Sequence, residues 1–329
     1  MAGFVRLRDR YDFIVLGGGH AGLQAALKAA LLQYSVLVVD RGPKYSRSYY
    51  APRLENIPGF PEAISGHKLL DLQIAALKPH AERVAYVTPA TATAATRDAD
   101  GFSVAFDWLK QPRTARARVL VLALGVVDRM PEIAGRIDDV FPWANQGIVD
   151  FCLVCDGHDM TGRSVGVLGH DAFAAHLALD LLHFAPRSVE ILTHGRPLLD
   201  GVVEGTAAGL REELARAGIA HVETAIAGFD GIREKEFRVR FVDGTERRYD
   251  RGFSGLGWYD MHDAMPRSLG CRFDSEGFVQ VDDEGRAIGD GGPIPGLYVV
   301  GDLKSGWNLI PEAWASAERA VLHAYAEYL

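Results

Sequence analysis

The sequence of 329 residues lacks the features that would place it in a membrane or on nucleic acid. Its longest apolar run, 119–127, is about half as long as a membrane-spanning helix requires. The charged N-terminal stretch 1–12 has no apolar core of the kind that a signal peptide needs. No dense Lys/Arg run occurs and the formal net charge is -8, so we expect neither a membrane nor a nucleic acid as a partner. A cytoplasmic location is the corresponding expectation.

Cysteine is scarce, with three residues in the whole chain. Cys152 and Cys155 form a CxxC pair, which in a reducing compartment is typical of a redox-active or metal-binding site rather than a structural disulfide. With His158 the pair could supply three zinc ligands, but no second cysteine pair completes a structural site, so zinc is the weaker alternative and we expect no bound metal. Cys271 stands alone, and we expect an ordinary, partly buried thiol.

Glycine is abundant, with 36 residues, and one cluster of it follows a predicted strand. The apolar run 13–16 leads into Gly17-Gly18-Gly19-His20-Ala21-Gly22, after which a helical pattern extends to Leu31. A second apolar run, 36–39, ends in Asp40, 23 positions after Gly17. This spacing is typical of a βαβ unit that binds a dinucleotide, in which the acid takes the ribose hydroxyls.

Each glycine of this motif has a physical role in such a unit. Gly17 allows the tight turn, Gly19 lets backbone N–H groups approach a pyrophosphate, and Gly22 permits close packing of the helix on the strand. The positive end of the helix dipole then points at the anion. A glycine-rich turn without a ligand is the alternative, and the flanking strand, helix and acid argue against it.

The same order of elements recurs in the middle of the chain. The apolar run 164–168 precedes a turn at 169–174 and a helical pattern through Leu181, and the run 188–192 is similar to 36–39. A repeated strand, turn and helix indicates two copies of one nucleotide-binding plan.

Each copy closes with a predicted strand that ends in glycine, at 119–125 and at 253–257. We interpret these strands as the two crossings of the chain between domains. The sequence therefore predicts an α/β fold of two nucleotide-binding, Rossmann-like βαβ domains, the second inserted into the first. The first domain would comprise 1–126 and 258–329, and the second 127–257.

Four motifs together resemble those of the low-molecular-weight thioredoxin reductases and their flavoprotein relatives. The glycine turn is one of them, and the others match the family's E-N-x-P-G-F-P, C-A-T-C-D-G and G-x-x-x-x-G-D. In order of sequence they are Gly17 to Gly22, Glu55-Asn56-Ile57-Pro58-Gly59-Phe60-Pro61, Cys152-Leu153-Val154-Cys155-Asp156-Gly157, and Gly296-Leu297-Tyr298-Val299-Val300-Gly301-Asp302. Their order and spacing extend over nearly the whole chain.

The resemblance implies a tightly bound FAD in the first domain, a redox-active disulfide on the second, and a homodimer. Three sets of residues would hold FAD: Gly17, Gly19, His20, Ala21 and Gly22 at the pyrophosphate, Asp40 and Arg41 at the adenosine end, and Asn56 with Asp302 of the Gly301-Asp302 pair along the ribityl chain. Without the resemblance, Asn56 also reads as a turn residue before Pro58, and Asp302 as a solvated acid before a helix.

The chemistry expected of the CxxC pair follows from the pKa of its thiols. A cysteine near a helix start lies against backbone N–H donors, which lower its pKa and favour the reactive thiolate. In relatives of this kind, the second cysteine, here Cys155, faces the flavin C4a position and the first, Cys152, attacks the partner disulfide. Asp156 is the candidate proton carrier, because each thiolate made or consumed requires the transfer of a proton.

The second glycine turn departs from the pattern of a nucleotide site. In the repeat, Gly19 corresponds to Asp171, which places a negative side chain where backbone would contact a pyrophosphate. Two unit charges about 4 Å apart repel by about 4 kcal/mol at an effective dielectric constant of about 20, equivalent to about a thousandfold in affinity. The alternative is that Asp171 turns outward or caps the helix.

The specificity end of that second site is equally unusual. An NAD site favours an acid at the end of the second strand, and the position that matches Asp40 is Thr193. An NADP site of this family favours a cluster such as H-R-R, and the sequence has His194-Gly195-Arg196. We therefore expect neither NADP nor NAD to bind well.

Two further departures lie around the predicted flavin. The family's G-G-Q-L is absent from the segment 40–54, and its R-Q-x-x-x-A-x-G-x-G is replaced by the segment 307–318. The second change introduces Trp307 and Trp314, which could form an aromatic lid near the ring. Their alternative role is as core or dimer-interface aromatics.

The sequence is best explained by an FAD-dependent thiol-disulfide oxidoreductase whose flavin exchanges electrons with Cys152 and Cys155 without efficient use of NADPH. Its electron partner would be ferredoxin, oxygen or a second flavin, for which a second FAD in the vacated nucleotide site is an option. Its substrate would be a thioredoxin-like protein or a small disulfide or dithiol. A conventional NADPH-dependent thioredoxin reductase is the main alternative, and a non-catalytic flavin redox sensor is a lesser one.

Overall fold

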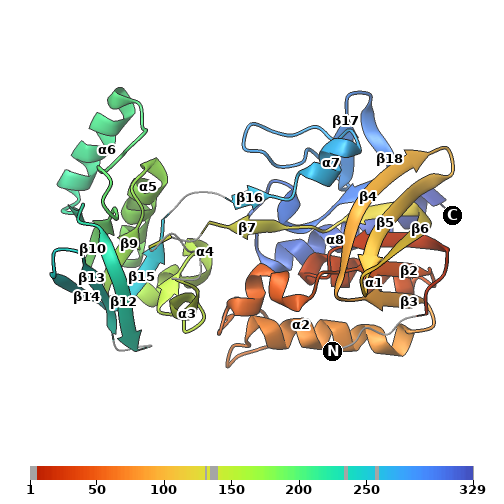
Figure 1. Cartoon of the computed structure of the whole chain (residues 1–329), viewed down its shortest axis with the longest axis horizontal. Helices are drawn as coiled ribbons and strands as arrows, with labels where there is room; N and C mark the ends of the chain where they lie inside the picture. Colours follow the sequence, from red (N-terminus) through yellow and green to blue (C-terminus); the bar gives the residue numbers. More distant parts are fainter. Residues whose placement is uncertain (1–5, 130–131, 134–139, 233–235, 256–258, 329) are drawn as a thin grey trace. The chain divides into compact units, whose positions relative to one another are not determined.

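The first unit is built on a sheet whose central strands are nearly continuous runs of valine and leucine, as expected for strands buried on both faces. Its order is β17-β18-β6-β1-β2-β3, with β5 paired to β6 and β4 to β5. Strands β18, β6, β1, β2 and β3 are parallel, whereas β4, β5 and β17 add antiparallel pairs (Figure 1). The bounds are β1 (Arg10–Leu16), β2 (Val36–Val39), β3 (Val84–Val87), β4 (Ala90–Asp98), β5 (Gly101–Trp108), β6 (Gln111–Leu122), β17 (Arg286–Gly289) and β18 (Gly292–Val299).

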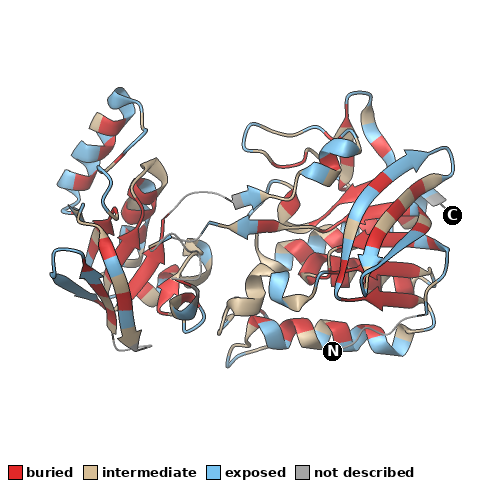
Figure 2. Ribbon diagram, in the orientation of Figure 1, coloured by how far each residue is buried: buried red, intermediate tan, exposed pale blue. Residues whose placement is uncertain are grey.

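Both faces of this sheet are covered. Phe13 and Val15 of β1 pack under the helices α1 (His20–Leu31), α2 (Gly66–Leu77) and α8 (Ile310–Tyr328). Ile14 and Leu16 point to the other face, where β4 and β5 and the short helix α7 (Ala264–Ser268) complete a second hydrophobic cluster. Figure 2 shows the resulting burial of the central strands. The glycine turn follows the carboxyl end of β1 and leads into α1. The carboxyl end of β2 lies beside this turn, since β1 and β2 are parallel neighbours.

The second unit has a parallel sheet of order β11-β10-β9-β15-β8. Helices α5 and α6 pack on one face, and the antiparallel sheet β12-β13-β14 packs on the other. The bounds are α3 (Phe141–Ala144), β8 (Val149–Asp150), α4 (Leu153–Asp156), β9 (Ser164–Leu168), α5 (Ala172–Leu181), β10 (Ser188–Leu192), α6 (Glu204–Arg216), β11 (Ala220–Val222), β12 (Ile226–Ile232), β13 (Glu236–Phe241), β14 (Glu246–Tyr249) and β15 (Arg251–Ser254).

This computed structural model describes residues 6–129, 132–133, 140–232, 236–255 and 259–328. The chain divides into one unit of 1–49, 64–127 and 260–329 and another of 50–63 and 128–259. The segments in which the chain passes between units pair as β7 (Val126–Asp128) and β16 (Tyr259–Met261). None of the helices in the described ranges is long and apolar enough to cross a bilayer.

The predicted fold is confirmed: the protein is an α/β chain with two Rossmann-like units of the same plan. The repeat predicted from the sequence is present as β1, α1 and β2 in one unit and β9, α5 and β10 in the other. The first predicted crossing strand ends earlier than expected, at Leu122 rather than at Gly125, which has a positive φ of 63°. The end of the second, at Gly257, lies outside the described residues, as does Trp258.

Candidate active site

The glycine turn of the first unit is shaped by close backbone approaches. Gly17 has a φ of 105°, and a Cβ there would lie 2.2 Å from the carbonyl oxygen of Ala123. A Cβ on Gly22 would lie 1.9 Å from the carbonyl oxygen of Gly17. Gly19 precedes α1 without a side-chain cap, and the first turn of α1, fully described, contains no acid. The positive end of α1 is therefore open to an anion such as a pyrophosphate.

His20, the first residue of α1, is buried and held by two hydrogen bonds. Its Nδ1 lies 2.5 Å from Oε1 of Gln73, and its Nε2 lies 2.6 Å from Oγ of Ser48. Burial lowers the pKa of His20, against smaller opposing effects of the Gln73 hydrogen bond and the charge of Asp302. With both ring nitrogens bonded inside the protein, His20 can contribute to pyrophosphate binding through its backbone, as can its neighbour Ala21.

Asp40 lies at the buried end of β2 and is fixed by two donors. The N–H of Gly18 donates to Oδ1 at 3.0 Å, and the hydroxyl of Tyr86 donates to Oδ2 at 2.7 Å. The next residue, Arg41, lies with its guanidinium 4.5 Å from the ring centroid of Tyr45. The hydrogen bond from Gly18 thus holds the Asp40 carboxylate against the glycine turn. The Arg41 guanidinium stacks on the Tyr45 ring next to it. These are the two residues expected at the adenosine end of FAD.

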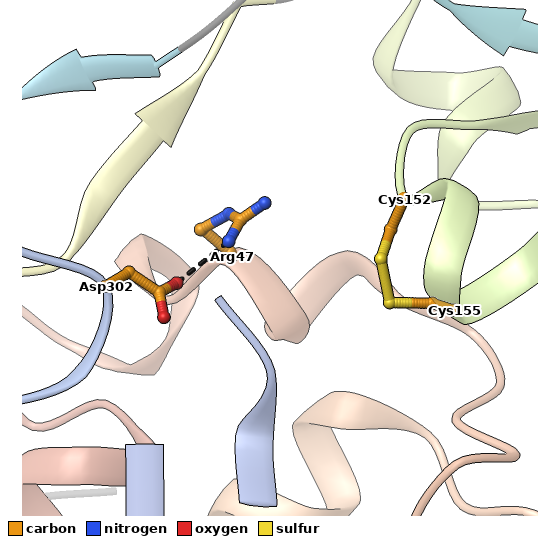
Figure 3. Close-up of a disulfide and its surroundings, with 4 residues drawn as sticks. All are labelled: Arg47, Cys152, Cys155 and Asp302. Carbon is orange, nitrogen blue, oxygen red and sulfur yellow. Dashed lines mark hydrogen bonds and ion pairs between the residues drawn. A yellow bond between two sulfur atoms is a disulfide. The ribbon is translucent and has the colours of Figure 1, made fainter. Parts of the chain in front are cut away.

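The Gly301-Asp302 pair forms a turn beside the start of α1. Gly301 has a φ of 69°, and a Cβ there would lie 2.9 Å from Cβ of Ala21. Asp302 forms an ion pair with Arg47, whose Nη1 lies 2.8 Å from Oδ2 (Figure 3). Sequence reasoning missed Arg47. One feature of the sequence could have pointed to Arg47: it lies in the segment 40–54, from which the family's G-G-Q-L is absent.

The two tryptophans of the segment 307–318 occupy different environments. Trp307 is 72% exposed. Trp314 lies edge-on to His20, with ring centroids 6.2 Å apart, and its indole Nε1 is buried without a hydrogen-bond partner in the described part of the chain. A buried donor of this kind is costly unless an acceptor satisfies it. Trp314 is therefore the residue of the two that lies beside the candidate cofactor site.

Cys152 and Cys155 form a disulfide in the structure, with their Cα atoms 5.2 Å apart (Figure 3). Cys152 directly precedes the short helix α4, as the sequence predicts, and its carbonyl oxygen accepts from the N–H groups of Cys155 and Asp156. Cys152 and Cys155 are themselves half-buried, and Val154 between them is 53% exposed. The disulfide therefore lies near the surface of its unit. Cys271 is buried, and burial raises the pKa of its thiol to about 11, which makes it unreactive.

Asp156 has an unusually high pKa for a carboxyl group. Burial raises its pKa to about 7; the charges of Asp159 and Glu55 act in the same direction, and that of His158 opposes them. Glu55 also pairs with His158, whose Nε2 lies 2.5 Å from Oε2. A carboxyl group that is half-protonated near neutral pH can both deliver and accept a proton beside the cysteines.

The structure does not bring together the three zinc ligands considered from the sequence. Among the described residues, His158 clusters with Glu55 and Asp159, whereas the two cysteines cluster with Asp156. The remaining predicted residue, Asn56, is exposed and belongs to the second unit, in the segment 50–63. Its assignment to the ribityl chain stays a prediction.

Comparison with known proteins defines the family. The profile described as pyridine nucleotide-disulphide oxidoreductase matches residues 11–317. The chain belongs to this family. The thioredoxin reductase of Listeria innocua is a similar curated protein, 26% identical over 90% of this chain and 86% of its own length. The thioredoxin reductase of Mycolicibacterium smegmatis is 29% identical over 89% of this chain and 88% of its own length. The crystal structure of thioredoxin reductase from Streptococcus pyogenes shares the fold, with a TM-score of 0.76, 21% identity and coverage of 97% and 98%.

The protein is thus a thioredoxin reductase-like flavin-dependent disulfide oxidoreductase. The first unit fits the FAD that the family implies. It has an open helix N-terminus, a turn in which Gly17 and Gly22 leave no room for a side chain, and the unsatisfied indole N–H of Trp314. When bound, FAD would supply a two-electron acceptor or donor.

The corresponding turn of the second unit is different. Gly19 and Asp171 occupy equivalent positions, since each is the N-cap of its helix with extended backbone angles. The Asp171 carboxylate accepts a hydrogen bond from the N–H of Ala174 at 3.1 Å. The capping alternative considered from the sequence is therefore correct, and the cap places a carboxylate at the helix N-terminus.

The loop after β10 lies against the same turn. The N–H of Leu199 donates to the carbonyl oxygen of His170 at 2.5 Å, and Nη1 of Arg196 lies 3.1 Å from His170 Nε2. Arg196 also pairs with Asp200 at 3.7 Å. Thr193 stands at the position where an NAD site favours an acid. It is buried, and its hydroxyl donates to the carbonyl oxygen of Arg196 at 2.5 Å. Several polar groups of this turn and loop are thus bonded within the protein.

The high pKa of Asp156 predicts a pH-dependent stability. The pKa of Asp156 is about 7 in the folded state, against an ordinary value of 3.8. The neutral carboxyl therefore favours the folded state below about pH 4, and this contribution is lost as the pH rises through 7. Asp156→Asn should remain neutral and gain about 2 kcal/mol over wild type at pH 8, less than the shift alone implies because the group is partly solvated.

Urea unfolding of the oxidised protein at pH 5 and pH 8 measures this difference. Asp159→Asn should retain part of this pH dependence, since it removes one charge that raises the pKa of Asp156 but leaves the buried acid in place. Equal pH dependence in wild type and Asp156→Asn would contradict the assignment of the raised pKa to Asp156.

Proposed function

We propose that this protein is an FAD-dependent thiol-disulfide oxidoreductase in which electrons pass between the flavin and the Cys152/Cys155 pair, and that it does not use NADPH efficiently. The observation that carries the proposal is the contrast between two equivalent helix starts. The start of α1 is uncapped by any side chain, whereas the start of α5 holds the carboxylate of Asp171. One nucleotide site fits a pyrophosphate and the other does not.

The loop contacts of the second unit support the same conclusion. An adenosine 2'-phosphate favours several cations at the end of the second strand, whereas this segment has one arginine, Arg196, which also contacts His170 and Asp200. Opening that loop for a dinucleotide would break the hydrogen bond from Leu199 to His170. The residues therefore fit NADPH poorly, and no step of the proposed reaction is assigned to it.

The reaction at the cysteines is an exchange of one disulfide for another. A thiolate of a substrate dithiol attacks the sulfur of Cys152, the bond between Cys152 and Cys155 breaks, and Cys155 leaves as a thiolate. The second substrate thiol then displaces Cys152, which releases oxidised substrate and leaves both cysteines reduced. Two electrons and two protons have moved, and Asp156 is positioned to take up or return a proton. In reverse, the same steps reduce a substrate disulfide.

The partners of this exchange are part of the proposal. A thioredoxin-like protein or a small disulfide or dithiol would react with the disulfide of Cys152 and Cys155. Ferredoxin, oxygen or a second flavin would exchange electrons with the FAD. We further propose that the enzyme is a cytoplasmic homodimer. Among these candidates, a thioredoxin-like substrate has the support of the curated relatives, which are named thioredoxin reductase.

The same names favour one competing function, that of a conventional NADPH-dependent thioredoxin reductase. Both functions require one FAD in the first unit, and they differ at the second nucleotide site. Reduction of the flavin by NADPH distinguishes the two functions, because only the conventional reductase requires it.

Denaturing release of the cofactor tests the flavin assignment directly. We expect one FAD per polypeptide, identified by chromatography and quantified against protein. Two flavins per chain would show that the second site has been reassigned to a flavin. A colourless protein loaded with zinc would overturn the proposed function.

A further inference from the structure

The segment that replaces the family's G-G-Q-L carries an arginine between two serines. Arg47 begins a single-turn 3₁₀ helix, Arg47–Tyr50, which follows another, Pro43–Tyr45. Ser46 and Ser48 flank it, and their hydroxyl oxygens lie 3.3 Å apart. This segment departs from the pattern of the family.

The two serines fix the segment to the candidate FAD site. Ser48 Oγ lies 2.6 Å from Nε2 of His20, the first residue of α1. Ser46 Oγ lies 3.7 Å from where a Cβ on Gly19 would be, which places this hydroxyl beside the N-terminus of the same helix. Gly66 allows this arrangement, since a Cβ there would lie 1.6 Å from the carbonyl oxygen of Ser48.

Arg47 connects this segment to the second FAD motif. Its Nη1 lies 2.8 Å from Oδ2 of Asp302, and the two side chains are only 18% and 19% exposed. Asp302 belongs to the turn whose Gly301 contacts the first turn of α1. Arg47 therefore joins the serine-flanked segment, which lies beside the glycine turn, to the G-D turn. Figure 3 shows the Asp302 carboxylate oriented against its guanidinium.

The chemistry of a guanidinium in this place favours a phosphate as its ligand. Arginine has five N–H donors in a planar fork, so it can bind a carboxylate and a phosphate at once. A pyrophosphate carries negative charge at the helix N-terminus, where Ser46 offers a hydroxyl donor. Charge-assisted hydrogen bonds between arginine and phosphate are stronger than neutral ones, especially when the groups are partly buried.

We propose that Arg47 is an FAD-binding residue that bridges the Asp302 carboxylate and the FAD pyrophosphate, with Ser46 as an additional donor. The inference rests on the FAD site of the proposed function. It gives the segment 43–50 a specific role, the recognition of the diphosphate of FAD.

The test compares a ligand with and without phosphate on the full-length apoprotein. Binding of FAD and of riboflavin is followed by quenching of flavin fluorescence in wild type and in Arg47→Ala, Arg47→Gln and Arg47→Lys. We expect Arg47→Ala and Arg47→Gln to weaken FAD binding by about tenfold to a hundredfold, and Arg47→Lys by less. Riboflavin binding should change by less than about threefold, because the lost contact is to phosphate.

Arg53→Ala is the matched control, since Arg53 also pairs with a carboxylate, Glu55, but belongs to the other unit. FAD binding that is unchanged in Arg47→Ala and Arg47→Gln would overturn the inference, as would an equal loss of FAD and riboflavin affinity. Circular dichroism identifies a variant that does not fold. If Arg47→Ala does not fold, Arg47→Gln, which keeps a polar side chain but removes the charge and the guanidinium fork, then decides. Wild-type apoprotein that binds no FAD would instead refute the proposed function.

Discussion

Anaerobic dithiothreitol is expected to bleach the visible flavin band of this protein, whereas micromolar NADPH should leave the flavin oxidised. The small dithiol can reach the half-buried disulfide of Cys152 and Cys155, but NADPH must bring its pyrophosphate against Asp171. A repulsion of about 4 kcal/mol would weaken binding about a thousandfold. Absorbance spectra recorded during the two titrations measure the difference.

A variant of Asp171 separates the effect of its negative charge on NADPH binding from its effect as the N-cap of α5. Asp171→Ser keeps a side chain that can cap α5 but removes the negative charge, so helix stability should change little. We expect this variant to bind NADPH at least about tenfold more tightly than wild type, measured by calorimetry. The contacts of the loop after β10 would still oppose full recovery. Rapid bleaching of the wild-type enzyme by micromolar NADPH would lead us to abandon the NADPH-independent function for the conventional reductase.

The parts of the fold that the sequence predicts are those determined by local pattern. The run 13–16 becomes the buried end of β1, and α1 starts directly after the glycine turn. The repeat around Asp171 is equally local, because strand, turn and helix lie within a few residues of one another. Equivalence of Gly19 and Asp171 could therefore be inferred from their spacing alone and is confirmed by their positions as N-caps.

Contacts between distant residues were not predictable in the same way. Asp40 could be recognised at the end of its strand, but its hydrogen bond to Tyr86 depends on the pairing of β2 with β3. Arg47 and Asp302 are 255 positions apart, and no periodicity in the sequence relates them. These contacts depend on how the elements pack, and packing has no signature within a window of a few residues.

The two halves of the chain show how a small local change separates cofactor binding from fold. The same strand, turn and helix are present twice, and both helices start at equivalent residues. An aspartate supplies the capping acceptor that an empty turn lacks, so it stabilises the fold at the position where a pyrophosphate would bind. The hydrophobic residues that build the second sheet are unaffected, because they point to the two faces of the sheet and not into the turn.

Cys155→Ser should retain FAD yet lose reduction of the flavin by dithiothreitol, by more than about a thousandfold in rate. Without Cys155, a dithiol has no disulfide to reduce, and Cys152 alone cannot pass two electrons by thiol-disulfide exchange. Anaerobic stopped-flow absorbance gives the rate, and the flavin-to-protein ratio shows that the cofactor is still bound.

Cys271→Ala is the matched control for that experiment, because it removes a buried thiol whose pKa is about 11 and which lies in the core of the first unit. Its flavin should be reduced at the wild-type rate. Cys152→Ser should fail like Cys155→Ser, since the disulfide requires both sulfurs, but it leaves in place the cysteine that the family resemblance assigns to the flavin. If dithiothreitol reduced the flavin of either cysteine variant as fast as that of wild type, electrons would reach the cofactor without the disulfide, and the assignment of Cys152 and Cys155 as the reaction centre would be wrong.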